Sequence, residues 1–212
     1  VMPLPIEVPA KWWVHHIESP RPEDILIGRT EHEAILGAVS LSGLECIAKT
    51  AISKKTFVKA LLDLHDAAVA RTDGARPILH ISSHGNENGI ELSDGEFLAW
   101  NVLGEWLQHI NAASKGHLIL CMSTCNGFSA SRMAMLQAGN ILPFEVMIGP
   151  TKPVAWSDAA VGFTVLYHHL QKTTHVSDAV HRMNVAAGVD SFLHWHGQAA
   201  QETYLDLVAK NN

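Results

Sequence analysis

Three short apolar runs, each followed by a polar loop and then by a segment with helical periodicity, constrain the fold more than any other feature. The runs cover residues 77–82, 118–122 and 146–148. Each is bounded by turn residues and is short for a buried helix, so each predicts a buried strand. Strands that alternate with helices are typical of a mostly parallel sheet covered by helices. The sequence therefore predicts an α/β fold.

The segments between these strands predict the covering helices. A helix after the N-cap residue Ser53 places an apolar stripe on one face, made of Phe57, Leu61, Leu64 and Ala68. Residues 89–98 alternate about an Asp-Gly turn and predict a hairpin. Further helices are expected through residues 102–110, from 127 to a stop at Gly139, after a cap at Ser157, between Ser177 and Gly188, and around the core-facing residues 204–207.

Length and charge narrow the class of protein. The 212 residues suit one domain with a real core. The formal net charge of -6, with no basic cluster beyond Lys54–Lys55, argues against nucleic-acid binding. No apolar run approaches the roughly 18 residues of a membrane span. Residues 1–30, with five of the nine prolines, are expected to form an N-terminal arm with at most one added strand, and residues 31–212 the main domain.

The N-terminus has neither the basic start nor the apolar stretch of a secretory signal, so a cytoplasmic protein is expected. A start at Val1 leaves open that the chain is a fragment of a larger protein. Three cysteines, an odd number in a chain of this size, argue against a disulfide framework. Cys46 and Cys121 are interpreted as small hydrophobic residues, which is the usual role of a buried cysteine.

Cys125 and His84 are interpreted differently because each lies just beyond a predicted strand. Ligands of open α/β sheets bind beyond the carboxyl ends of the strands. If the two strands are neighbours, about 5 Å apart, the thiol and the imidazole meet in one crevice. A nearby imidazolium, together with the start of a helix at Gly127, favours the nucleophilic thiolate, and the imidazole then protonates the leaving amine. The N–H groups of Gly85 and Cys125 are the expected oxyanion hole.

These segments resemble a known family. Residues 79–85, which end in His84-Gly85, and residues 118–125, which end in Ser123-Thr124-Cys125, resemble the caspase-like cysteine peptidases of clan CD, most closely the bacterial CHAT branch related to separase. Residues 153–160 are similar to a segment of that branch that usually carries a Trp and an Asp, here Trp156 and Asp158. The resemblance spans about residues 75–188.

The resemblance implies a caspase-like three-layer α/β/α sandwich and a cysteine endopeptidase that cleaves protein or peptide substrates through a thioacyl intermediate. It implies no cofactor, substrate-binding roles for Ser123, Trp156 and Asp158, and frequent control by a regulatory partner or an upstream signalling protein. The chain departs from the pattern at Thr124 and at Asn126-Gly127. Metacaspases bind a basic side chain with an Asp at the position of Ser123, so this motif does not imply basic specificity.

Other interpretations stay open. A catalytically inactive scaffold would bind partners through the same groove. Another cysteine hydrolase or an amidotransferase would normally have Gly two residues before the nucleophile and its His downstream, unlike Ser123 and His84. Trp156 is also typical of a core, Asp158 of the first turn of a helix, and His80 of a core or supporting residue. Fourteen histidines include the pairs 168–169 and 194/196, but no acid or cysteine recurs at zinc-site spacing, so no metal is expected.

Overall fold

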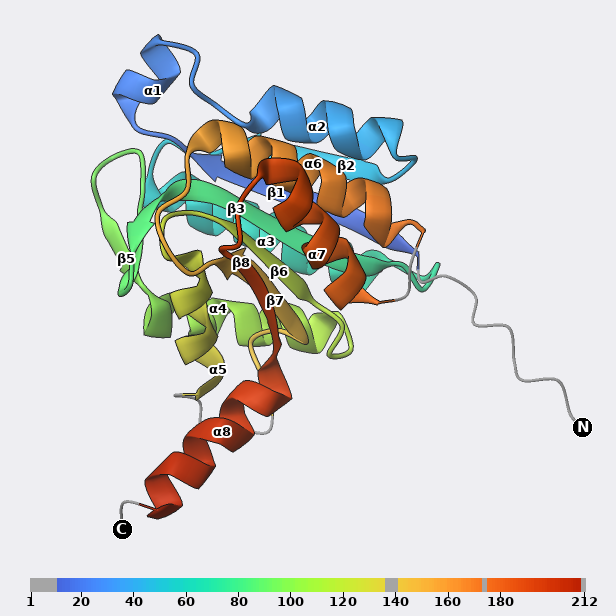
Figure 1. The fold of residues 1–212 in the computed structure, drawn as a ribbon, viewed down its shortest axis with the longest axis vertical. Helices are drawn as coiled ribbons and strands as arrows, with labels where there is room; N and C mark the ends of the chain where they lie inside the picture. Colours follow the sequence, from blue (N-terminus) through green and yellow to red (C-terminus); the bar gives the residue numbers. More distant parts are fainter. Residues whose placement is uncertain (1–10, 136–140, 173–174, 211–212) are drawn as a thin grey trace, which may run out of the picture.

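A central sheet lies between two layers of helices in the computed structural model, which describes residues 11–135, 141–172 and 175–210 (Figure 1). The main path of the sheet runs in the order β2 (Glu45–Thr50), β1 (Trp12–Ser19), β3 (Arg76–Asn86), β6 (Ile119–Ser123), β7 (Val146–Pro150) and β8 (Phe192–His196). Neighbouring strands on this path are parallel, except that β8 is antiparallel to β7. The predicted α/β class with a mostly parallel sheet is confirmed.

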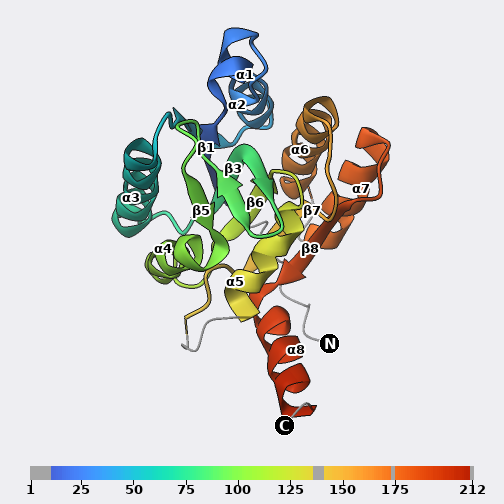
Figure 2. The same ribbon diagram turned by 90° about the vertical axis from the view of Figure 1, so that its left-hand side faces the viewer.

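The helices divide between the two faces of the sheet (Figure 2). One face carries α3 (Lys54–Ala70), α4 (Trp100–Ala113) and α5 (Arg132–Met135), and the other carries α2 (His32–Leu41), α6 (Trp156–Leu170) and α7 (Val176–Ala187). Each face buries its own apolar cluster against the strands, because the strands are apolar on both sides. The predicted three-layer sandwich is therefore confirmed.

Helix α3 shows how the sequence determines one of these layers. The Ser53 hydroxyl accepts the Thr56 N–H at 3.3 Å, and the Thr56 hydroxyl accepts the Ser53 N–H at 3.0 Å, so the helix begins with a capping box. Phe57, Leu61 and Leu64 of the predicted stripe are fully buried. Three of its residues thus point at the sheet as helical spacing requires.

Strand β3 is longer than predicted, and it leaves the parallel sheet at its carboxyl end. Its last residues pair with the predicted hairpin, β4 (Gly89–Glu91) and β5 (Phe97–Ala99). His84 pairs with Glu91 there, whereas the parallel pairing of β3 with β6 ends at Ser82. His84 therefore lies in the extension of β3, beyond the parallel part of the sheet.

The one strand that the sequence allowed within residues 1–30 is β1, whose place in the sheet the sequence did not predict. β1 pairs with β2 on one side and with β3 on the other, so it lies inside the sheet and is not added to its edge. Its polar residues His15, His16 and Glu18 are as fully buried as Trp13 and Ile17. A buried strand with three ionisable residues lacks the continuous apolar run used to recognise the others. The boundary at residue 30 stays a prediction.

The predicted starts of α6 and α7 differ from the structure, and the predicted end of α7 at Gly188 agrees with it. Helix α6 begins at Trp156 without a side-chain cap, and Ser157 lies inside its first turn. The segment after Cys125 starts as a five-residue 3-10 helix, η1 (Gly127–Ser131), before α5, and the stop predicted at Gly139 lies outside the described residues. Helix α7 starts at Val176, and Gly188 ends it in the left-handed conformation (φ 65°) that favours glycine.

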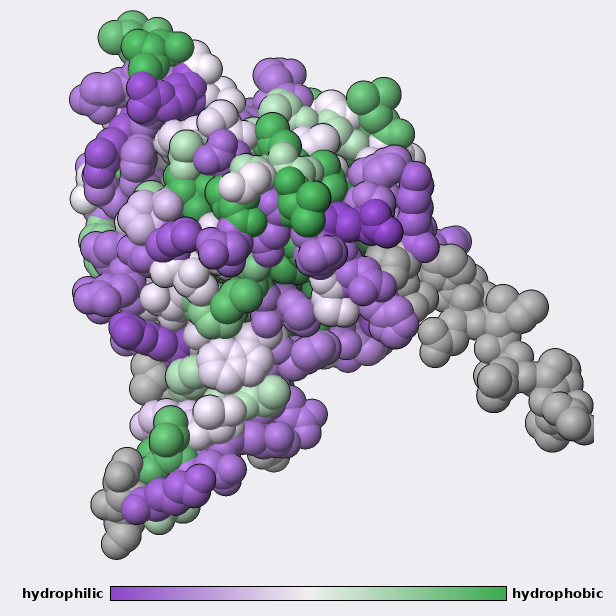
Figure 3. Space-filling view, viewed as in Figure 1, coloured by the Kyte–Doolittle hydropathy of each residue, from purple (hydrophilic) through white to green (hydrophobic). Residues whose placement is uncertain are grey.

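The last helix, α8 (Gly197–Lys210), does not bury the residues predicted to face the core. Leu205 and Leu207 are 58% and 55% exposed. Helix α8 extends away from the sheet after its first turn, so its later residues have no layer to pack against (Figure 1). The surface view shows a second exposed apolar tip at the end of α1 (Pro22–Leu26), where Leu26 and Ile27 protrude (Figure 3).

Within residues 11–135, 141–172 and 175–210, no helix combines the length and the apolar character that a membrane span requires.

Replacing Leu166 of α6 with alanine should lower the free energy of unfolding by about 2–5 kcal/mol, because the fully buried side chain leaves a cavity. Leu205→Ala is the matched control on the exposed helix and should change the free energy by less than about 0.5 kcal/mol. Urea unfolding followed by circular dichroism measures both. Equal losses for the two variants would place α8 in the core, contrary to the structure.

Candidate active site

A tight turn at the carboxyl end of β6 presents Cys125. The Gly127 N–H donates to the Thr124 carbonyl at 3.0 Å, and Asn126 adopts the left-handed conformation (φ 55°), which Asn tolerates better than most residues. A Cβ on Gly127 would lie 2.8 Å from the Met122 Cβ, so no larger residue fits there. The Asn-Gly pair after the cysteine therefore forms the turn that leaves Cys125 partly exposed.

His84 reaches the same edge of the sheet as Cys125. Ser82 of β3 pairs with Ser123 of β6 in the parallel sheet. His84 lies two residues after Ser82, and Cys125 lies two residues after Ser123. Both side chains line one pocket, whose volume of about 30 Å³ admits a group of about the size of one water molecule. A larger cavity of about 720 Å³ lies between α4 and α8, away from both residues.

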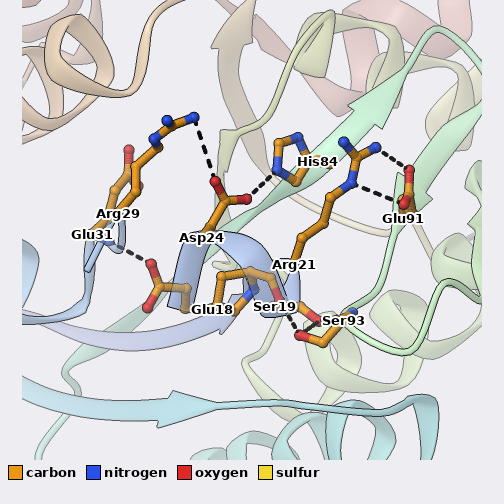
Figure 4. A network of polar contacts seen from close by, with 10 residues as sticks. Glu18, Ser19, Arg21, Asp24, Arg29, Glu31, His84, Glu91 and Ser93 are labelled. Atoms are coloured by element: carbon orange, nitrogen blue, oxygen red, sulfur yellow. Dashed lines mark hydrogen bonds and ion pairs between the residues drawn. The ribbon is translucent and has the colours of Figure 1, made fainter. Parts of the chain in front are cut away.

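Asp24 of α1 holds the ring of His84 (Figure 4). Its Oδ2 lies 2.7 Å from the His84 Nε2, and its Oδ1 lies 3.5 Å from the Arg29 guanidinium. The Asp24 side chain is only 7% exposed, so solvent screens this contact weakly. Because Nε2 faces a carboxylate, Nδ1 is the ring nitrogen left for a thiol. The ring of Trp156 approaches His84 edge to face, with centroids 5.7 Å apart.

The connection that carries Asp24 is fixed to the hairpin that continues from His84. Arg21 donates two hydrogen bonds to Glu91 of β4, at 3.0 and 2.6 Å (Figure 4). Nearby, the Ser93 N–H donates to the Ser19 hydroxyl at 3.0 Å. An exposed ion pair contributes little to stability, but a bidentate pair fixes a geometry. These contacts therefore position α1 relative to His84.

Asp24 has no sequence feature that marks it as a partner of His84. An acid two residues after Pro22 is what the first turn of any helix favours, so its type and place carry no sign of a catalytic contact. Its partner lies 60 residues away in the chain. The contact of Asp24 with His84 depends on the fold, and no sequence pattern near Asp24 indicates it.

Gly85 has no room for a side chain. A Cβ would contact the Thr124 Oγ1 and would lie 2.8 Å from the Gly89 carbonyl oxygen. Gly85 faces Ile90 in the pairing of β3 with β4. The residue is therefore glycine for steric reasons, and the oxyanion role of its N–H stays a prediction, as does that of the Cys125 N–H.

A buried acid lines the same pocket. Glu31, only 2% exposed, accepts the Ser123 hydroxyl at 2.8 Å on Oε1 and the Ser82 hydroxyl at 2.5 Å on Oε2. Ser123 was predicted to bind substrate, and it lines the pocket while it anchors this carboxylate. Sequence reasoning missed Glu31, since its two hydroxyl partners lie 51 and 92 residues away.

Of the other two predicted substrate-binding residues, one lines the pocket and the other does not. Trp156 lines the pocket with Val154, Pro150 and Phe192. Asp158 is not among the described residues that line it, and its Oδ1 accepts the Ser157 hydroxyl at 3.3 Å in the first turn of α6. The structure thus brings Trp156, but not Asp158, to Cys125.

The other two cysteines lack the character of nucleophiles. Burial raises the pKa of the Cys46 thiol to about 11 and that of Cys121 to about 12. Both therefore remain protonated thiols at neutral pH, and only a thiolate is a competent nucleophile. Within the described part of the chain, no three His, Cys, Asp or Glu side chains are grouped so as to hold a metal ion.

The three-layer sandwich and its mostly parallel sheet define a caspase-like fold. Among the solved structures that match is gingipain R, described as an Arg specific cysteine proteinase, with a TM-score of 0.52 and 12% sequence identity. The match covers 82% of this chain but 41% of the gingipain chain, so this chain spans about two fifths of that protein's length. At this identity the likeness shows the fold. No family model and no curated protein matches the sequence.

A second buried carboxyl group contacts the backbone of Glu31. Glu18 of β1 is fully buried, its Oε1 accepts the Glu31 backbone N–H, and its Oε2 has no hydrogen-bond partner. Burial is the main cause that raises the pKa of Glu18 to about 7, and the nearby Glu31 carboxylate adds to it. Between about pH 4.5 and 7 the folded protein therefore keeps a proton that the unfolded chain releases.

Stability should therefore fall as pH rises through this window, because the folded state binds more protons there. Glu18→Gln removes the titration, so its free energy of unfolding relative to wild type should rise between pH 4.5 and 7.5 by roughly 2 kcal/mol. Urea unfolding at half-unit pH steps measures the difference. Glu33→Gln, on an exposed carboxyl, is the control, and parallel profiles for Glu18→Gln and wild type would contradict the assignment.

Proposed function

We propose that this chain is a cysteine endopeptidase in which Cys125 is the nucleophile and His84 the acid and base. The observation that carries the proposal is that both side chains line one pocket beyond neighbouring parallel strands, with Asp24 against the other side of the imidazole. The burial of Cys46 and Cys121 supports Cys125 as the reactive thiol.

The proposed reaction is acyl transfer. The Cys125 thiol gives its proton to the His84 Nδ1 and attacks the amide carbonyl carbon, which forms a C–S bond. His84 returns the proton to the leaving amine as the C–N bond breaks, and water then hydrolyses the thioacyl intermediate. The Asp24 carboxylate stabilises the transient imidazolium and fixes the ring. The N–H groups of Gly85 and Cys125 are the proposed donors to the oxyanion.

The finer assignment is part of the same proposal. The His84-Gly85 and Ser123-Thr124-Cys125 endings of β3 and β6, with Trp156 after β7, support the bacterial CHAT branch related to separase. A cytoplasmic location, and control by a partner or upstream signal, go with that branch. The pocket volume of about 30 Å³ supports such control, because a space of this size admits no amino-acid side chain until residues that line it move.

A positively charged substrate side chain is the proposed specificity. The Glu31 carboxylate lines the pocket with Cys125, and its Oε1 accepts one hydroxyl, which leaves a lone pair for a substrate N–H. The described specificity of gingipain R for Arg supports the same class of substrate. A long side chain reaches Glu31 only if Trp156 or Val154 moves.

One alternative has an observation in its favour. The narrow pocket equally suits a catalytically inactive caspase-like scaffold, which would bind a partner without admitting an amide to Cys125. Iodoacetamide distinguishes the two, because it needs only an accessible, activated thiol.

Iodoacetamide should label Cys125 faster than Cys46 or Cys121, and His84→Ala should slow that labelling, because the imidazole no longer favours the thiolate.

Peptide turnover should disappear in Cys125→Ala and fall about 10- to 1000-fold in Asp24→Asn, which removes the charge against the His84 Nε2. Glu23→Gln, an exposed acid one residue away, is the control. Labelling mainly at Cys46, or equal turnover in Asp24→Asn and the control, would refute the assignment.

Peptides with Arg at the cleaved bond should be turned over at least about tenfold faster than matched peptides with citrulline, which has nearly the same shape but no charge. Glu31→Gln should remove that preference, because the pocket loses its negative charge. The kcat/KM ratio for the two peptides is the measurement, and Glu33→Gln provides the control. An undiminished Arg preference in Glu31→Gln would show that another group selects the side chain.

A further inference from the structure

A chain of buried polar side chains leads away from the pocket behind Glu31. It runs from Glu31 through Ser82 and His80 of β3 to Tyr167 of α6, which also contacts the buried thiol of Cys121. Ser82, His80 and Tyr167 have no exposed surface, and none of them lines the pocket among the described residues. Any effect of these three residues on a substrate must therefore pass through Glu31.

The distances join these residues in one series of hydrogen bonds. The Ser82 Oγ lies 2.5 Å from the Glu31 Oε2, and the His80 Nε2 lies 3.1 Å from the same Oγ. The Tyr167 hydroxyl lies 2.5 Å from the His80 Nδ1. The His16 Nε2 also lies 3.1 Å from the Ser82 Oγ.

The chemistry of the groups fixes the direction of the series. A carboxylate only accepts, so Ser82 gives its single hydrogen to Glu31. The Ser82 oxygen must then accept from the ring nitrogen Nε2 of His80. If the imidazole is neutral, its other nitrogen, Nδ1, accepts from the Tyr167 hydroxyl. In that tautomer every hydrogen in the series points toward Glu31.

The two buried carboxyl groups, Glu31 and Glu18, differ in the hydrogen-bond donors that they accept. Glu31 accepts two hydroxyl groups, and the His80 Nε2 lies 3.5 Å from its Oε2. Glu18 accepts backbone N–H groups instead of hydroxyl groups, has an unpartnered Oε2, and its pKa is raised to about 7 mainly by burial. The Glu31 carboxylate, which lines the pocket, therefore has hydroxyl donors on both of its oxygens, whereas Glu18 is not among the described residues that line the pocket.

Packing alone does not explain the series. A buried polar group costs free energy unless it is hydrogen-bonded, and apolar side chains of similar size would fill the same space at no such cost. His80 already packs edge to face on Phe163, with ring centroids 4.5 Å apart, so an apolar residue would have a suitable neighbour. The polar series is better explained by the carboxylate at its end.

We propose that His80 and Tyr167 are positioning residues that hold the Glu31 carboxylate charged and oriented toward the pocket, and so set its affinity for a cationic side chain. The inference deepens the proposed function, since the same pocket is the substrate site. It predicts effects on cation binding and KM, with kcat unchanged, because neither residue touches the reacting atoms.

Agmatine, a small guanidinium compound, tests the inference without requiring peptide cleavage. Bound next to Glu31, which requires the same movement of Trp156 or Val154 as a long substrate side chain, it should protect Cys125 from iodoacetamide. Tyr167→Phe removes one hydroxyl and keeps the ring, and it should raise the agmatine concentration for half protection about tenfold. Tyr204→Phe, at the chain's other tyrosine on α8, is the matched control and should behave as wild type. Absent protection in wild type, or equal half-protection in all three proteins, would overturn the inference.

His80 provides a second variant if Tyr167→Phe does not fold, which circular dichroism checks. His80→Leu should weaken protection at least as much as Tyr167→Phe, whereas His80→Gln, which keeps an N–H near the position of Nε2, should partly restore it. No restoration by Gln would overturn the donor role of His80. Protection by agmatine without peptide turnover would refute the peptidase and leave the inference intact. Where turnover occurs, Tyr167→Phe should raise the KM for Arg peptides about tenfold.

Discussion

The parallel pairing of β3 with β6 is the constraint on which the site depends. Ser82 faces Ser123 in this pairing, so the chain segments that follow emerge side by side at one edge of the sheet. One of them carries His84, and the other turns sharply through Asn126 and Gly127 to present Cys125. A shift of this register by one residue would turn the side chains of one strand to the opposite face relative to those of the other. The backbone hydrogen bonds between β3 and β6 therefore determine that His84 and Cys125 lie at the same edge of the sheet.

A second constraint is the interior place of β1. The connection from β1 to α2 starts beside β3, and it therefore carries Asp24 to His84 and Glu31 to the pocket. The two acids have different partners. Asp24 meets an imidazole and a guanidinium, while Glu31 meets hydroxyl groups, so one carboxylate is committed to His84 and the other keeps a free lone pair. Two neighbouring acids on one connection can serve different roles for this reason.

The sequence predicted the parts of this arrangement that depend on local patterns. The buried strands β3, β6 and β7 follow apolar runs, and Cys125 and His84 follow two of them. β1 was missed as an interior strand because His16 and Glu18 interrupt its apolar pattern, although both are fully buried by long-range contacts. Asp24 and Glu31 were missed because the residues that give them meaning lie 51 to 92 positions away. Side-chain partners at such separations are set by topology, which no local pattern encodes.

Trp156 connects the shape of the pocket to the geometry of the imidazole. Its ring packs edge to face on His84 and also lines the pocket that a substrate must enter. The ring therefore braces the proposed base and at the same time occupies space that a long side chain needs. A movement of Trp156 that admits such a side chain also changes a contact of His84, whose Nε2 remains held by Asp24. The buried carboxylate contact, which does not depend on Trp156, can then keep the imidazole in place while the pocket opens.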